Sequence, residues 1–263
     1  MYIMKEKYSL ALWWGAARWF AHIWVIQYIE EDNISIEEVS GTSIWAIIAA
    51  LFAIWRTSEE MITIAKDMNY IKLIDVSLKE GLLKGDKIYK KLHSIFWEIL
   101  IEELNIPLKI IATSIYNWER KVFESWKVID AIRASISLPG IFKPHSIEGE
   151  LYMDGGTVNN LPIECLNGKN IIAVSALKKV NEELQSKRKI LWMDFNVWFF
   201  KLNFQILQRT LIFMMKQNED RSLQTQGKNI ILIEPEYGEL DFHSFNKVDE
   251  LVKVWYREAE KCI

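Results

Sequence analysis

The sequence has little glycine, proline and cysteine. It contains 11 Gly, 5 Pro and 2 Cys among 263 residues, whereas a chain of this length ordinarily contains roughly 18 glycines. The two cysteines, Cys165 and Cys262, are far apart and belong to no CxxC or Cys/His spacing. This composition argues against a disulfide framework and against a zinc site. We therefore expect a protein of a reducing compartment that holds no metal and no cofactor.

The sequence also lacks a strong charge bias and an uninterrupted apolar span. Its net charge is −3 and its isoelectric point is near 5.9, which gives no electrostatic case for a nucleic-acid partner. The apolar run over residues 8–26 contains Arg18 and His22 and has no small-residue cleavage site. The dense apolar stretch over residues 190–215 contains Asp194, Lys201 and Arg209, so it makes a poor membrane-spanning helix. We expect a cytoplasmic protein whose membrane contact, if it has any, is peripheral.

Tryptophan is the residue in excess, with 12 copies against 11 glycines. One interpretation is a tryptophan-rich core or a belt at a membrane interface. Belts place aromatic residues at the ends of long apolar spans, but these tryptophans are scattered through turns and loops. The pattern therefore indicates tryptophan at positions where a chain ordinarily has glycine.

Strand-like and helix-like segments alternate along the chain without a linker between them. This alternation predicts one α/β domain over residues 8–263, with a three-layer α/β/α fold and a mostly parallel central sheet. The expected strands are Tyr8–Leu12, Val39–Thr42, Pro107–Thr113, Asn170–Ser175 and Lys228–Glu234. The expected helices include Phe20–Glu31, Ile44–Trp55, Asp130–Ser137 and Lys247–Lys261.

Three short blocks carry residues suited to catalysis. The second block has the frame of a nucleophile elbow, G-x-S-x-G, in which a serine occupies a tight turn between a strand and a helix. The first block could direct backbone N–H groups at a developing oxyanion, and the third exposes a carboxylate beside two glycines. The blocks read Trp14-Gly15-Ala16-Ala17-Arg18-Trp19, Gly41-Thr42-Ser43-Ile44-Trp45 and Asp154-Gly155-Gly156.

In this order and spacing, the three blocks resemble those of the patatin-like phospholipase family, which has a glycine-rich block, then G-x-S-x-G, then D-G-[AG]. Further matches lie over residues 20–23, 134–142 and 153–162, and the similarity covers most of residues 8–177 and, more loosely, 228–260. The resemblance implies a patatin-like fold and a Ser–Asp dyad that cleaves carboxylic esters of lipids through an acyl-enzyme. In that scheme Ser43 is the nucleophile and Asp154 is the base. The oxyanion hole is formed around Trp14, Gly15 and Ala16, in a loop that Arg18 helps to hold.

Two alternatives remain open. One is a catalytically inactive domain of the same family that binds acyl chains or a protein partner. The other is a Ser-His-Asp esterase, for which His243 is the one histidine that fits the order Ser…Asp…His. We interpret His22 as structural and His93 and His145 as ordinary surface or loop residues.

Tryptophan replaces the family's glycine at Trp14, Trp19 and Trp45. We hypothesise that a codon that specifies glycine in the source has been translated as tryptophan, and UGG codons at these positions would reject the idea. At the elbow, we expect the Trp45 indole to tilt the helix, displace Ser43 or enter the substrate cleft. Other tryptophans at which glycine is expected are Trp24, Trp55, Trp118, Trp126 and Trp255.

The segment over residues 190–216 combines many aromatic side chains with scattered basic residues. We expect it to flank or cover the active site as an apolar lid that contacts membranes. The alternative is an ordinary core helix.

Overall fold

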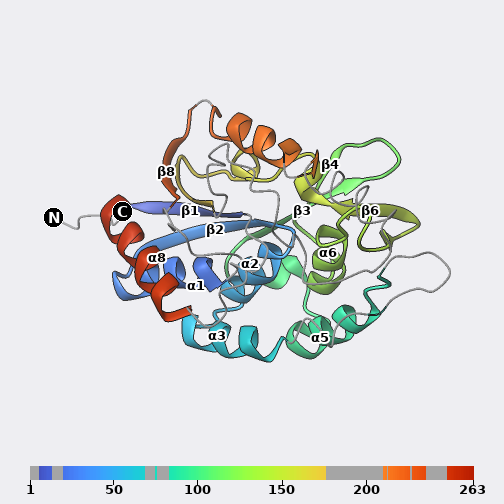
Figure 1. The fold of residues 1–263 in the computed structure, drawn as a ribbon, viewed down its shortest axis with the longest axis horizontal. Helices are drawn as coiled ribbons and strands as arrows, with labels where there is room; N and C mark the ends of the chain where they lie inside the picture. The colour runs from blue at the N-terminus through green and yellow to red at the C-terminus, as the bar shows by residue number, and fades with distance from the viewer. Residues whose placement is uncertain are drawn as a thin grey trace, which may run out of the picture.

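A computed structural model of the chain describes residues 6–13, 20–68, 75, 83–175, 210–211, 213–225, 227–234 and 248–263. Within these residues a central sheet lies between two layers of helices (Figure 1). The predicted three-layer α/β/α fold with a mostly parallel sheet is therefore confirmed.

The sheet has eight strands in the described part of the chain, in the order β5-β6-β3-β2-β1-β7-β8, with β4 pairing with β3 beside this path. The neighbours from β3 to β8 run parallel, whereas β4, β5 and β6 form antiparallel pairs at one side. The strands are β1 (Lys7–Trp13), β2 (Ser35–Thr42), β3 (Leu108–Ser114), β4 (Arg120–Phe123), β5 (His145–Ile147), β6 (Glu150–Asp154), β7 (Asn170–Ser175) and β8 (Asn229–Ile233).

One layer of helices packs below the sheet in Figure 1, and the helix over residues 213–222 lies above it. The lower layer contains α1 (Phe20–Glu31), α2 (Trp45–Ala53), α3 (Ser58–Asp67), α5 (Asp86–Phe96), α6 (Val128–Ser135) and α8 (Val248–Cys262). Short 3₁₀ turns are η2 (Ile101–Glu103), η3 (Gly155–Thr157) and η4 (Ile163–Cys165).

Burial explains why the central elements form where they do. All seven residues of β3 are buried, as expected for a strand covered on both faces. All nine residues of α2 are also buried, so this helix is apolar around its whole circumference and lies in the core. The helix α3 is more polar and begins with a capping box, in which Thr57 and Glu60 each accept a hydrogen bond from the other's backbone N–H.

Several tryptophans have the backbone conformation that glycine favours. Of the seven non-glycine residues with positive φ among the described residues, four are tryptophans: Trp55 (60°), Trp97 (50°), Trp118 (60°) and Trp126 (104°). This conformation costs about 1–3 kcal/mol for a residue with a Cβ. Trp55 follows the C-cap of α2, and Trp118 lies in the turn before β4, where the sequence predicts glycine-like backbone. The backbone at these positions agrees with the glycine-to-tryptophan hypothesis, which the coding DNA decides.

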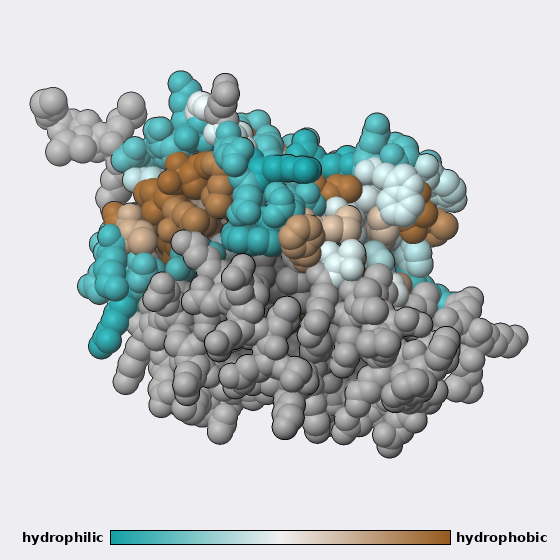
Figure 2. Space-filling view, turned by 45° about the horizontal axis from the view of Figure 1, so that its top comes forward, coloured by the Kyte–Doolittle hydropathy of each residue, from teal (hydrophilic) through white to brown (hydrophobic). Residues whose placement is uncertain are grey.

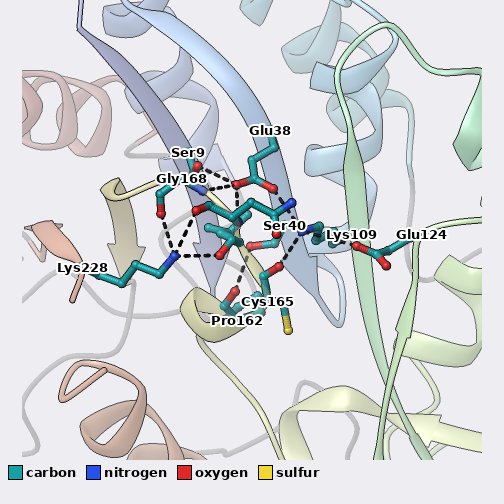
Figure 3. Close-up of polar contacts among 11 residues, drawn as sticks. Ser9, Glu38, Ser40, Lys109, Glu124, Pro162, Cys165, Gly168 and Lys228 are labelled. Carbon is teal, nitrogen blue, oxygen red and sulfur yellow. Dashed lines mark hydrogen bonds and ion pairs between the residues drawn. The ribbon is translucent and has the colours of Figure 1, made fainter. Parts of the chain in front are cut away.

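A buried ionic network fixes the loop that leads into β7 (Figure 3). The Glu38 carboxylate, on β2, accepts hydrogen bonds from Ser9 Oγ at 2.8 Å and Gly168 N at 2.7 Å. Its ion pair is with Lys109 on β3, at 3.1 Å, and Lys109 Nζ also donates to the carbonyl of Cys165. The network therefore joins β1, β2 and β3 to residues 165–168.

Candidate functional site

The elbow expected around Ser43 is present as a strand, a tight turn and a helix. β2 ends at Thr42, Ser43 has a φ of 59°, and α2 begins at Trp45. A Cβ at Gly41 would lie 2.8 Å from the carbonyl oxygen of Trp45 and 2.9 Å from Cα of Ala46. Glycine at position 41 thus allows the helix to pass close to the strand that precedes it.

Asp154 is the last residue of β6 and faces Ser43 across the end of the sheet. Ser43 Oγ donates a hydrogen bond to Asp154 Oδ2 at 2.5 Å, and the N–H of Gly156 donates to Asp154 Oδ1 at 2.8 Å. A Cβ at Gly155 would lie 2.3 Å from the carbonyl oxygen of Ile111. The turn after Asp154 therefore needs glycine to sit against β3, and the structure brings the serine of the second block together with the aspartate of the third.

The surroundings of Asp154 make its carboxylate unusually basic. The side chain is completely buried, and burial raises its pKa to about 6, although the hydrogen bonds from Ser43 and Gly156 act in the opposite direction. No described lysine or arginine forms an ion pair with it. At neutral pH the group is mostly ionised, yet it accepts a proton more readily than an exposed aspartate.

The three histidines in the described part of the chain have other partners. His22 is buried, and burial lowers its pKa to about 3; its Nε2 lies 2.8 Å from the carbonyl oxygen of Trp13. His145 pairs with Asp130, and His93 pairs with Glu98. His243, the residue on which the Ser-His-Asp alternative depends, lies outside the described residues.

The expected disturbance by Trp45 is not observed. Its indole is completely buried and stacks on the His22 ring, with 3.9 Å between ring centroids, while Ser43 keeps its contact with Asp154. The Trp255 ring of α8 also lies near His22, with 5.9 Å between the ring centroids. The expectation that Trp45 displaces Ser43 or enters the substrate cleft was wrong, because the buried indole stacks on His22 of α1 while the Ser43–Asp154 hydrogen bond is kept.

Two predicted segments lie wholly or partly outside the described residues. The whole first block, Trp14 to Trp19, lies outside the described residues, and with it the expected oxyanion hole and Arg18. Of the expected lid over 190–216, residues 190–209 and 212 also lie outside. Its described end is helical, with Phe213 66% exposed, Met214 43% exposed and Met215 buried. Figure 2 shows that apolar residues interrupt the hydrophilic surface on one face of the molecule.

One contact of the elbow was not predicted from the sequence. The N–H of Ser43 donates to Ser135 Oγ at 2.7 Å. Ser135 belongs to the 134–142 match, but nothing in the sequence indicated that this segment reaches the elbow.

The described residues contain neither a cluster suited to a metal ion nor a helix suited to span a membrane. They contain no group of three or more His, Cys, Asp or Glu side chains placed to hold a metal ion. None of the helices among them combines the length and the apolar character needed to cross a bilayer.

The chain is similar to known proteins of one family. A family model described as patatin-like phospholipase matches residues 15–166. An uncharacterized NTE family protein of Mycobacterium tuberculosis is 35% identical over 178 residues, covering 65% of this chain and 49% of the relative. Human patatin-like phospholipase domain-containing protein 6 is 28% identical over 212 residues, covering 74% of this chain and 15% of the relative. The neuropathy target esterase sws of Drosophila melanogaster is also 28% identical, over 75% of this chain and 15% of the relative.

A solved structure shares the fold. The crystal structure of VipD from Legionella pneumophila superposes with a TM-score of 0.59 at 14% identity, covering 98% of this chain and 66% of VipD. The chain spans about half the length of the mycobacterial relative and a smaller part of the animal relatives.

Proposed function

Because this chain belongs to the patatin-like phospholipase family, we propose that it is a serine hydrolase that cleaves carboxylic esters of lipids. Ser43 is the nucleophile and Asp154 is the base. The observation that carries the proposal is the 2.5 Å hydrogen bond from Ser43 Oγ to Asp154 Oδ2. A nucleophile bonded to its base at the tip of an elbow is the arrangement that covalent catalysis by serine requires.

In the first half of the reaction, Asp154 takes the proton of Ser43 as Oγ attacks the ester carbonyl carbon. The tetrahedral intermediate collapses when the bond to the leaving alcohol breaks, and Asp154 gives the proton to that alcohol. In the second half, Asp154 takes a proton from water, whose oxygen attacks the acyl-enzyme. The carboxylic acid leaves and the proton returns to Ser43 Oγ. The pKa of about 6 on Asp154 suits both directions of transfer at neutral pH.

The developing oxyanion needs hydrogen-bond donors other than the N–H of Ser43, because Ser135 Oγ already accepts that bond. Backbone N–H groups of Trp14, Gly15 and Ala16 are the proposed donors, as the family resemblance implies.

The substrate and its location are part of the same proposal. The relatives' names contain the words phospholipase and esterase, which supports a lipid ester as the substrate. Exposed Phe213 and Met214, on the helix that packs against the 155–157 turn through Asn218 and Thr157, would favour peripheral contact with a membrane.

The test is labelling with a fluorophosphonate probe followed by peptide mass spectrometry, together with hydrolysis of p-nitrophenyl esters. Ser43 should carry the label, and Ser43→Ala should lose both the label and the turnover without a change in melting temperature. Ser40→Ala is the matched control, because it removes a buried hydroxyl from β2, the strand that leads into Ser43, and should retain both. A label on another residue, or turnover by Ser43→Ala near that of the wild type, would refute the assignment. An intact but unlabelled protein would support the inactive binding domain, and loss of activity in His243→Ala would support the triad.

A further inference from the structure

The hydroxyl of Ser135 forms a hydrogen bond with the backbone of the elbow. Ser135 is the last residue of α6 and is completely buried. Its Oγ accepts the hydrogen bond from the N–H of Ser43 at 2.7 Å and donates to the carbonyl oxygen of Ile111 at 2.5 Å. Since its one proton goes to Ile111, the hydroxyl presents a lone pair to Ser43 in a fixed direction.

Ser137, two residues further along the chain, contacts the backbone of Asp154 through its carbonyl group. The N–H of Asp154 donates to the carbonyl oxygen of Ser137 at 2.9 Å. Residues 135–137 therefore contact the backbone N–H groups of both Ser43 and Asp154, which lie 111 residues apart in the sequence.

Arg133 anchors this short segment. Its guanidinium is buried and donates to Ser137 Oγ at 2.6 Å and to the carbonyl oxygens of Lys84 at 2.6 Å and Lys143 at 3.3 Å. Ser137 Oγ in turn donates to the carbonyl oxygen of Arg133 at 2.8 Å. With these bonds the end of α6 is held by two neighbouring loops, so Ser135 is a fixed point for the elbow.

We propose that Ser135 is a positioning residue for ester hydrolysis, which fixes Ser43 Oγ within hydrogen-bond distance of Asp154. The inference rests on the proposed function of these two residues. Ser43 needs such support because its φ of 59° lies in the left-handed region, which a residue with a Cβ rarely adopts. Removing the Ser135 hydroxyl leaves the N–H of Ser43 and the carbonyl of Ile111 without their partner, and the turn is free to relax.

Loss of the Ser135 hydroxyl should affect the geometry and the titration of the Ser43–Asp154 pair. A misplacement of about 1 Å can cost roughly 100-fold in rate. When Ser43 moves away, Asp154 also loses a hydrogen bond that lowers its pKa. The acid limb of the pH–rate profile therefore shifts upward as turnover falls.

The experiment compares Ser135→Ala, Ser135→Cys and Ser40→Ala with the wild type. We expect Ser135→Ala to lower kcat by about 10- to 100-fold, with KM little changed and the acid limb at higher pH. Ser135→Cys replaces the hydroxyl with a weaker hydrogen-bonding group. Its kcat and acid limb should therefore lie between those of the wild type and those of Ser135→Ala. Ser40→Ala removes a buried hydroxyl that donates to the carbonyl of Pro162 at 3.4 Å, and both of its parameters should match the wild type.

A wild-type kcat and acid limb in Ser135→Ala, or equal losses in Ser40→Ala, would overturn the positioning role. If Ser135→Ala does not fold, Ser135→Cys decides by the same two measurements. A turnover that survives in Ser43→Ala would instead refute the proposed function itself. A dead Ser43→Ala beside a fully active Ser135→Ala would refute this inference alone.

Discussion

Ser43 donates a hydrogen bond to the buried carboxylate of Asp154 at 2.5 Å, and Ser9 donates one to the buried carboxylate of Glu38 at 2.8 Å. Among the described residues Ser175 also donates to a buried carboxylate, that of Glu219, at 3.0 Å. The first pair lies where β2 and β6 end, and Ser43 is half-buried on a turn. The second pair lies within β1 and β2, and Ser9 is completely buried in its strand (Figure 3). The same two functional groups therefore occur in two different surroundings.

The difference is in what else each carboxylate binds. Asp154 receives a single further hydrogen bond among those described, from the N–H of Gly156, and burial raises its pKa to about 6. Burial by itself would also raise the pKa of Glu38. There, however, hydrogen bonds from Gly168 and Ser9, together with the ammonium of Lys109, outweigh burial and hold the pKa below its usual range.

This comparison shows that a serine bonded to a carboxylate is not by itself a catalytic pair. A base must accept a proton near neutral pH, which a neighbouring cation opposes. In the proposed function the nucleophile must also reach its substrate; Ser43 lies half-buried on a turn, whereas Ser9 is completely buried in a strand.

The largest expected difference is in turnover. Asp154→Asn should lower kcat by about 10²- to 10⁴-fold, because an amide cannot accept the serine proton. Glu38→Gln, the matched change in the other pair, should leave kcat of the folded protein nearly unchanged. Steady-state hydrolysis of a p-nitrophenyl ester measures both, and a large loss of kcat in folded Glu38→Gln would contradict the comparison.

The second difference is in stability, and here Glu38→Gln should have the larger effect. Glu38→Gln leaves Lys109 buried, with its side chain 5% exposed, and its remaining carboxylate partner, Glu124, is 63% exposed. Breaking such a buried pair costs about 3–5 kcal/mol of unfolding free energy. Asp154→Asn should not destabilise, since it removes a buried charge that has no described cation beside it. Urea unfolding of the two variants measures this, and a greater loss of stability in Asp154→Asn would contradict it.

The third difference is in pH dependence. The folded-state pKa of Asp154, about 6, lies above its ordinary value of 3.8. Its contribution to stability is therefore present at low pH and falls by about 3 kcal/mol as pH rises through this range. The pKa of Glu38 is lowered, so its contribution is present above its ordinary pKa and is lost as pH falls. We expect the acid limb of kcat/KM near pH 6 from Asp154.

Stability measured against pH separates the two groups. Asp154→Asn should abolish the decrease in unfolding free energy between about pH 4 and 6, and Glu38→Gln should reduce the loss that occurs in stronger acid. An acid limb near pH 4 would show that Asp154 is not the base, or that its burial is less complete.

The sequence predicted best what depends on local structure. The strand Asn170–Ser175 has its predicted bounds, and the elbow around Ser43 forms as expected. Trp55 and Trp118 have positive φ where a helix end and a turn predict glycine. In each case the residues that fix the conformation are neighbours in the chain.

Contacts between distant segments could not be predicted in this way. No local pattern pairs Glu38 with Lys109, and it is the pairing of β2 with β3 that buries the two charges together. The contact of Ser135 with Ser43 spans 92 residues. The burial of Trp45 involves stacking on His22 of α1, which no local pattern specifies.

The smallest expected effect, and the closest control, comes from Ser9→Ala. This substitution deletes the same hydroxyl as Ser43→Ala, but Glu38 keeps its bonds from the backbone N–H groups of Asn167 and Gly168 and its ion pair with Lys109. We expect the free energy of unfolding to fall by about 1 kcal/mol, as for the loss of one hydrogen bond. Neither kcat nor fluorophosphonate labelling of Ser43 should change. Ser43→Ala should give the reverse result, with the free energy of unfolding retained and both ester turnover and fluorophosphonate labelling lost. If Ser9→Ala lowered kcat tenfold in a protein that remains folded, the two pairs would be coupled through β1 and β2. The Glu38 network would then help to position the catalytic end of the sheet, in addition to stabilising the loop before β7.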